Sequence, residues 1–206
     1  SIVVGQKGLY QDVNNCNGGS GGGGSFVFID DSPLVIAGGG GGAHGYWDYN
    51  GVDASAETSG STNEFSAGEP GEDGYGGGAG PCGSGWPGAG GTGWFSNGGN
   101  TCEWSSMITE GGYYRSNLFL GGARNPNTNP GTQGQDGAFG GGGGAFHGAG
   151  GGGGYSGGGG GGSCFIDEFP VGGGAGSYND GDNQNNLSGY NSGHGAVVIT
   201  TTRDIW

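Results

Sequence analysis

The chain has 206 residues, of which 63 are glycine, 18 are acidic and only four are Lys or Arg, so its formal net charge is −14. This charge excludes nucleic acid and anionic membrane surfaces as partners, because both would repel the chain. No apolar stretch approaches the ~20 residues that a membrane-spanning helix needs, so we expect no insertion into a bilayer.

A glycine content this high without a Gly-X-Y period is typical of disordered, silk-like polymers. Two properties of the composition favour a folded chain instead. Charged residues make up only 11% of the chain, whereas aromatic residues also reach 11% and include five Trp. Disordered linkers usually show the opposite balance, with much charge and few aromatic side chains.

Short runs of β-branched and aromatic residues, bounded by Gly, Asn or Asp, predict β-strands along the chain. In chain order these runs are residues 1–4 (SIVV), 25–29 (SFVFI), 33–37 (PLVIA), 117–121 (NLFLG) and 195–202 (GAVVITTT). No window has a sustained helical period, and glycine would interrupt one. The sequence therefore predicts an all-β fold with little or no α-helix.

Glycine runs separate these strands, and we expect them to fold as a bundle. They lie at 18–24, 38–42, 76–80, 140–162 and 172–176. A backbone without Cβ atoms adopts the polyproline II conformation, whose N–H and C=O groups point outward with three residues per turn. Because buried backbone groups must be paired, such polyglycine II helices can pack side by side and bond laterally. We expect one domain, residues 1–206.

Residues 46–130 are predicted to form an irregular, aromatic-rich insert. Trp and Tyr are the residues that dominate interface hot spots, so Trp86, Trp94 and Trp104 are candidate contacts for a protein or glycan partner. The alternative is that these rings pack between the sheet and the bundle, as aromatic side chains usually do.

The four cysteines, Cys16, Cys82, Cys102 and Cys164, match no zinc-binding spacing. An even number in such a chain predicts two disulfides in an oxidising compartment, with all three pairings open. The alternative is four free buried thiols in a cytosolic protein. Asn186 begins an Asn-Leu-Ser triplet, which is an acceptor sequence for an N-linked glycan.

No catalytic constellation stands out, and we expect neither an enzyme nor a cofactor. His44, His147 and His194 lie in turn-like contexts without a nucleophile elbow or an adjacent helix. The oxygen-rich stretches 68–74 and 179–186 have ligands suited to calcium, although Asn, Asp and Gly are more often solvated turn residues.

The blocks SIVVGQKG, PLVIAGGGGGA and GHGAVVIT occur in an order that resembles the extracellular glycine-rich module of the anaplastic-lymphoma-kinase and leukocyte-tyrosine-kinase receptors. Uncharacterised secreted glycine-rich proteins are similar. The resemblance implies an antiparallel β-sandwich of the tumour-necrosis-factor (jelly-roll-like) kind with an inserted hexagonal bundle of polyglycine helices. In the receptors this module binds a small protein ligand. The family has an earlier strand, upstream of SIVVGQKG, that is absent from this sequence.

A sandwich that lacks one strand exposes unpaired backbone on the neighbouring strand, which is a template for another chain. We expect Ile2, Val3 and Val4 to form such an acceptor, with the tail residues Ile205 and Trp206 as donors in a second copy. Head-to-tail contacts of this kind produce filaments. The predicted protein is an extracellular structural or adhesive homopolymer. The alternatives are a ligand-binding receptor ectodomain and a surface- or ice-binding protein.

Overall fold

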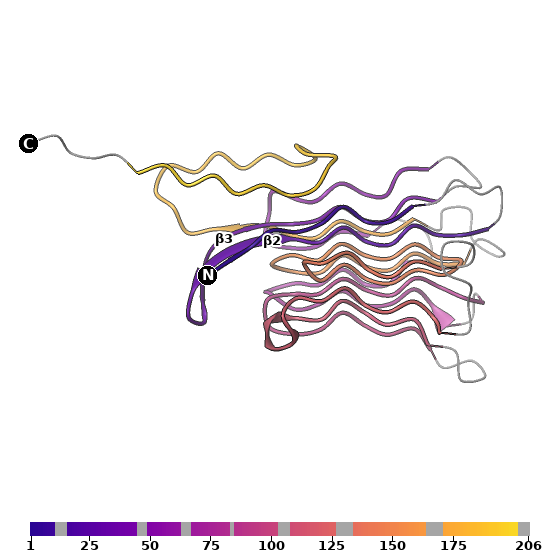
Figure 1. Ribbon diagram of the computed structural model, residues 1–206. Coiled ribbons are helices and arrows are strands. Elements are labelled where there is room, and N and C mark those ends of the chain that lie inside the picture. The colour runs from indigo at the N-terminus through magenta and orange to yellow at the C-terminus, as the bar shows by residue number, and fades with distance from the viewer. Residues whose placement is uncertain are drawn as a thin grey trace, which may run out of the picture.

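The computed structural model describes residues 1–10, 16–44, 49–62, 67–82, 85–102, 108–126, 134–163 and 171–201. Its regular structure is one antiparallel sheet in the order β1-β2-β3-β4 (Figure 1). The strands are β1 (Ile2–Val3), β2 (Ser25–Ile29), β3 (Ser32–Ala37) and β4 (Tyr178–Asn179). The described residues contain no α-helix, and η2 (Arg115–Asn117) is a short 3-10 turn. The predicted all-β class is confirmed.

The hairpin β2–β3 forms the centre of the sheet. Its two strands coincide with two of the predicted runs, and a tight turn at Asp30 and Asp31 joins them. Asp30 has φ 50°, in the left-handed region that Asp enters more readily than most residues. Phe26 and Ile36 are paired in the register of the hairpin and are both buried, so they fix which face of the sheet packs inward.

Two predicted strands are not formed. Residues 117–121 follow η2 in a turn, where Leu118 and Phe119 have φ 58° and 53°. Phe119 is 2% exposed, so burial of its ring holds this turn in the core instead of extending it as a strand. Residues 195–201 contain no strand either, and the fourth strand comes instead from Tyr178–Asn179. The second sheet of the expected sandwich stays a prediction.

The glycine runs lie side by side along most of the molecule and bond laterally through their backbones (Figure 1). In residues 149–155 each successive N–H donates to a different neighbouring segment, and the same neighbour returns after three residues. The pairs, donor first, are Gly150 with Gly19, Gly153 with Gly22, Gly151 with Ala89, Gly154 with Thr92, Gly152 with Gly173 and Tyr155 with Gly176, at 2.9–3.1 Å.

The carbonyl groups of the same run accept hydrogen bonds from three further segments. These pairs, donor first, are Gly42 with Gly150, Gly39 with Gly153, Gly161 with Ala149, Gly158 with Gly152 and Gly143 with Gly151. Residues 149–155 are therefore surrounded by six bonded neighbours. A three-residue repeat is the one that polyproline II geometry has. The assignment of the runs as polyglycine II helices stays a prediction.

The bundle needs glycine for close approach more than for unusual backbone angles. A Cβ added at Gly151 or Gly152 would lie 2.0 Å from the carbonyl oxygen of Gly158 or Gly39, respectively. Most of the described glycines have a comparable clash with a neighbouring backbone, whereas only five of them have a positive φ. A side chain added at such a glycine would push the neighbouring segments apart and break their lateral bonds.

Residues 46–130 differ from the irregular insert that the sequence predicts, because much of this region belongs to the bundle. Gly77 donates to Gly91, Gly90 to Gly99 and Gly98 to Gly112, at 2.8–2.9 Å. Figure 1 shows these segments, in magenta, stacked against the orange segments of residues 140–160. Short Gly-Gly and Gly-Ala pairs are thus sufficient to join the bundle when their neighbours are also free of side chains.

The hydrophobic core lies where the sheet meets the bundle. Phe26, Ile36, Trp94 and Phe119 form it, and the rings of Phe26 and Phe119 are stacked with centroids 4.1 Å apart. The guanidinium of Arg115 covers the Trp94 ring at 5.0 Å and also pairs with Asp31 at the hairpin turn. This cation–π contact closes the core toward solvent.

Candidate interaction surface

The outer edge of β1 is open. Ser1 and Phe28 exchange two backbone hydrogen bonds, of 2.8 and 3.0 Å, across the β1–β2 pair. Because bonded and non-bonded pairs alternate in an antiparallel ladder, the N–H and C=O of Ile2 point away from β2. Among the described residues no segment pairs with this side of β1. The predicted acceptor strand is therefore an edge strand.

The side chains of the acceptor differ in exposure. Ile2 is 52% exposed and Val4 is 41% exposed, whereas Val3 packs against the core formed by Phe26 and its neighbours. Val3 thus anchors the strand, and Ile2 and Val4 present apolar side chains beside the unpaired backbone. The predicted donors, Ile205 and Trp206, lie outside the described residues.

A C-terminal arm, residues 180–201, runs along the outside of the bundle and reaches beyond the end of the sheet (Figure 1, yellow). Four backbone N–H groups join the arm to the rest of the described residues: Asp180 donates to the carbonyl of Leu34, Gly195 to the carbonyl of Gly5, Lys7 to His194 Nδ1 and Ala56 to Ser188 Oγ. After Gly195 most of the described residues are exposed, with Val198 at 88% and Ile199 at 64%, whereas Val197 is half-buried.

The candidate tryptophans do not form one surface. Trp94 is fully buried and stacks with Phe26 and Phe119, so its assignment as an interface residue is wrong and the packing alternative holds. Trp86 is half-buried, with its ring 5.5 Å from that of Phe146 and 5.0 Å from that of His147. Trp104 lies outside the described residues.

One buried histidine, His44, and one half-buried histidine, His147, lie in the bundle. His44 is completely buried, and neither of its ring nitrogens makes a hydrogen bond among the described residues. Burial lowers the pKa of His44 to about 4, although the nearby backbone of His147 partly favours the protonated ring. Burial also lowers the pKa of His147. Both rings are therefore neutral at pH 7, and sequence patterns alone did not indicate how deeply they are buried.

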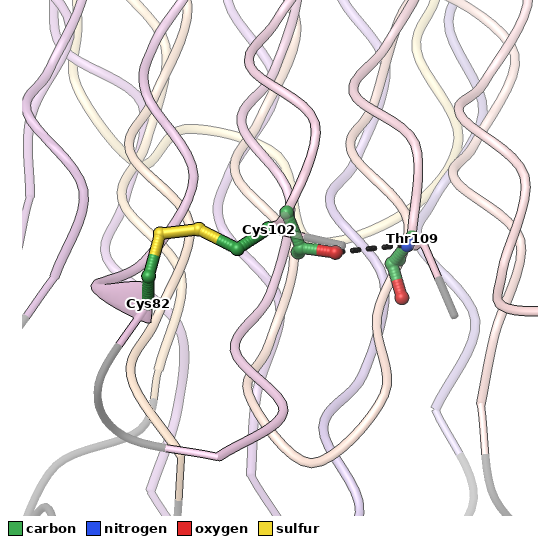
Figure 2. The surroundings of a disulfide bond; sticks show 4 residues. Cys82, Cys102 and Thr109 are labelled. Atoms are coloured by element: carbon green, nitrogen blue, oxygen red, sulfur yellow. Dashed lines mark hydrogen bonds between the residues drawn. A yellow bond between two sulfur atoms is a disulfide. The ribbon is translucent and has the colours of Figure 1, made fainter. Parts of the chain in front are cut away.

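The structure selects one of the three disulfide pairings for two of the cysteines. Cys82 is bonded to Cys102, with Cα atoms 5.5 Å apart, a separation that is usual for disulfides. Cys16 is also disulfide-bonded, and Cys164 lies outside the described residues. Figure 2 shows the Cys82–Cys102 bond close to Thr109, whose N–H donates to the hydroxyl of Thr101 at 2.9 Å. The disulfide thus joins a loop to the bundle.

The acidic stretches do not gather into a calcium site. Among the described residues no three His, Cys, Asp or Glu side chains come together as metal ligands. In the stretch 179–186 the polar side chains bond locally: the side-chain oxygen of Asn179 accepts from the N–H of Gly181, and its amide donates to Asn186. These are contacts of a solvated turn. Asn186, the glycan acceptor, is exposed on this turn.

Comparison of the chain with protein-family models, with curated proteins and with solved structures found no match. The resemblance to the receptor module stays a prediction. Within the described residues there is no helix of the length and apolarity that crossing a membrane requires. The edge of β1 and the exposed C-terminal arm are therefore the features that bear on function.

Proposed function

We propose that the protein is an extracellular structural protein that assembles into filaments by strand complementation. One observation carries the proposal: within the described residues, the strand edge at Ile2 has no partner, and the segment after Gly195 has strand-forming composition and is mostly exposed. An edge with free N–H and C=O groups accepts an added strand. Because the donor and acceptor are different surfaces, each copy can bind one neighbour through its donor and another through its acceptor. Repetition of this head-to-tail contact builds a filament.

Two further properties support this role. The disulfide between Cys82 and Cys102 is a bond that persists in oxidising compartments, which favours a location outside the cell. Around residues 149–155, backbone hydrogen bonds to six neighbouring segments hold the bundle together laterally. Here peptide groups, and not large apolar side chains, make the contacts between segments. Such a subunit is suited to carrying load along a fibre.

Negative-stain microscopy and sedimentation of the purified chain test the proposal. We expect regular filaments for the wild type and fewer or none after deletion of residues 196–206, which removes the whole segment after Gly195. A wild-type chain that stays monomeric at all concentrations and salt conditions would overturn the proposal.

A second candidate is a ligand-binding module, and one observation favours it. Exposed apolar side chains gather near the hairpin turn: Ile29 is 61% exposed and Leu118 is 73% exposed, in segments that the Arg115–Asp31 ion pair holds together. An exposed apolar group of this kind is typical of a protein-binding surface. A monomeric chain that loses binding to a captured extracellular protein after Leu118→Asp would support this candidate over filament formation.

A further inference from the structure

The structure points to a particular donor strand for this assembly. We propose that residues 196–201 of one copy add to the outer edge of β1 in a second copy. This inference rests on the proposed function and makes it specific. It places the donor upstream of Ile205 and Trp206, the residues that sequence reasoning selected.

The composition of residues 196–201, AVVITT, suits a strand that is completed by a partner. Five of its six residues are β-branched, and it contains no Gly, Pro or charge. β-Branched residues favour the pleated, half-buried environment of a sheet. Segments of this kind are the ones that pair readily with other chains.

The same residues have no hydrogen-bond partner in the described part of their own chain. No hydrogen bond joins residues 196–201 to any other described residue. Val198 is 88% exposed and Ile199 is 64% exposed, which leaves two adjacent apolar side chains in water. Burying each of them on a partner would be favourable, and pairing would satisfy their backbone groups at the same time.

The acceptor has a matching chemistry. The outward N–H and C=O of Ile2 provide one bonded position on β1. Val4 follows β1 directly, and continuing the same alternation would give it a second outward position. Both side chains are partly exposed, so an added strand would cover apolar surface as well as backbone. Neither β1 nor the donor carries a like charge that would repel the other.

The chain's own tail is poorly placed to occupy this edge. Gly195 donates to the carbonyl of Gly5, and an antiparallel continuation of that contact would set Val197 opposite Val3. Because bonded and non-bonded positions alternate along β1, the backbone N–H and C=O of Val3 point toward β2 and cannot bond to Val197. The chain's own tail could pair with β1 only if its register shifted by one residue. Figure 1 shows the arm diverging from β1 and leaving the body instead. A second copy is therefore the occupant.

Variants in the two segments separate the donor from the acceptor. Val198→Asp places a charge in the donor, and Tyr190→Asp is its matched control because Tyr190 is 83% exposed in the same arm but outside the donor. Ile2→Pro removes only an outward N–H, which an edge strand tolerates. Ile2→Lys is a second acceptor variant that blocks the edge by charge and keeps the N–H.

We expect the wild type and Tyr190→Asp to assemble equally. Val198→Asp and the Ile2 variants should each raise the dissociation constant by at least about tenfold, since the loss of one such contact removes more than ~1.4 kcal/mol. An equimolar mixture of Val198→Asp and Ile2→Pro should give dimers and nothing larger, because only one competent donor and one competent acceptor remain. Sedimentation velocity measures all of these species, and thermal melts check that each variant is folded.

The outcomes distinguish this inference from the proposed function. If the Ile2 variants are monomeric while Val198→Asp assembles like the wild type, the edge is the contact but the donor is another segment, which overturns the inference alone. If the wild type is monomeric, both fail. If amide exchange of that monomer protects Ile2 and Val198 together, the chain's own tail fills the edge and the second-copy assignment is wrong.

Discussion

At the scale of single residues, the absence of Cβ atoms determines where the chain tolerates change. Gly152 lies in the bundle, and an added Cβ would be 2.0 Å from the oxygen of Gly39. Gly193 lies in the exposed arm, and its added Cβ would meet only Asn191 Oδ1, at 3.4 Å. Neither residue has a positive φ, so the two sites differ in space and not in backbone angle.

We therefore expect Gly152→Ala to lower the free energy of unfolding by about 2 kcal/mol or more, the cost of overpacking a dense interior. Gly193→Ala should change it by less than about 0.5 kcal/mol, as surface substitutions do. Urea unfolding of both variants measures the difference. Equal stability of the two would mean that the run around Gly152 is not tightly packed.

The buried ring of His44 predicts a dependence of stability on pH. The pKa of His44 is lowered to about 4 in the folded chain, whereas the ordinary value is 6.5. As the pH falls from 6.5 to about 4, the unfolded chain gains a proton on this ring that the folded chain does not accept, so the fold loses stability. The total loss is on the order of 3 kcal/mol.

Comparison of the wild type with His44→Gln isolates this contribution, because both chains share all other titrating groups. The free energy of unfolding should fall less in the variant than in the wild type between pH 7 and pH 4.5. Urea unfolding at the two pH values tests this. Parallel losses in both proteins would assign the pH dependence to the carboxylates instead.

At the scale of elements, the Cys82–Cys102 bond closes a loop whose ends are 20 residues apart in sequence. Closing such a loop restricts the unfolded chain and is worth about 3 kcal/mol in the chain-entropy model. We expect the double variant Cys82→Ser, Cys102→Ser to melt at a lower temperature than the wild type. Peptide mapping without reduction should recover the two cysteines in one linked fragment, and a linkage of Cys82 to another cysteine would contradict the structure.

The sequence predicts some elements better than others, for physical reasons. The hairpin of residues 25–37 is predictable because Val, Ile and Phe runs flank a tight turn. The strand Tyr178–Asn179 is not, because it is two residues long and depends on pairing with Val35 and Ile36. Residues 117–121 have strand composition, yet burial of Phe119 beside Phe26 outweighs it.

The candidate site was predictable in part. Ile2 and Val3 form β1 at the edge of the described sheet and Val4 follows them, whereas the role of these three residues as an acceptor for another copy stays a prediction. The burial of Trp94 was not predictable, because its neighbours Phe26 and Phe119 come from distant parts of the chain. The sequence also does not predict which segments are the neighbours of each glycine run. A run without side chains has no hydrophobic pattern that would fix its pairing register.

At the scale of the whole molecule, the net charge of −14 opposes contact between copies. Salt screens such repulsion, and at about 0.1 M the screening length is about 10 Å. We expect filament assembly to strengthen as the salt concentration rises from low values toward this range. Sedimentation across a salt series measures the effect, and assembly that weakens with added salt would indicate ion pairs between the copies.

The bundle around residues 149–155 buries peptide groups where most proteins bury hydrocarbon. Exposure of apolar surface raises the heat capacity on unfolding, whereas exposure of polar surface lowers it. The heat-capacity change per residue should therefore be below the ~12–15 cal/mol/K of ordinary globular domains. Scanning calorimetry would then give an unusually flat stability curve, and a fibre of such subunits would keep nearly the same strength in cold and in warm water.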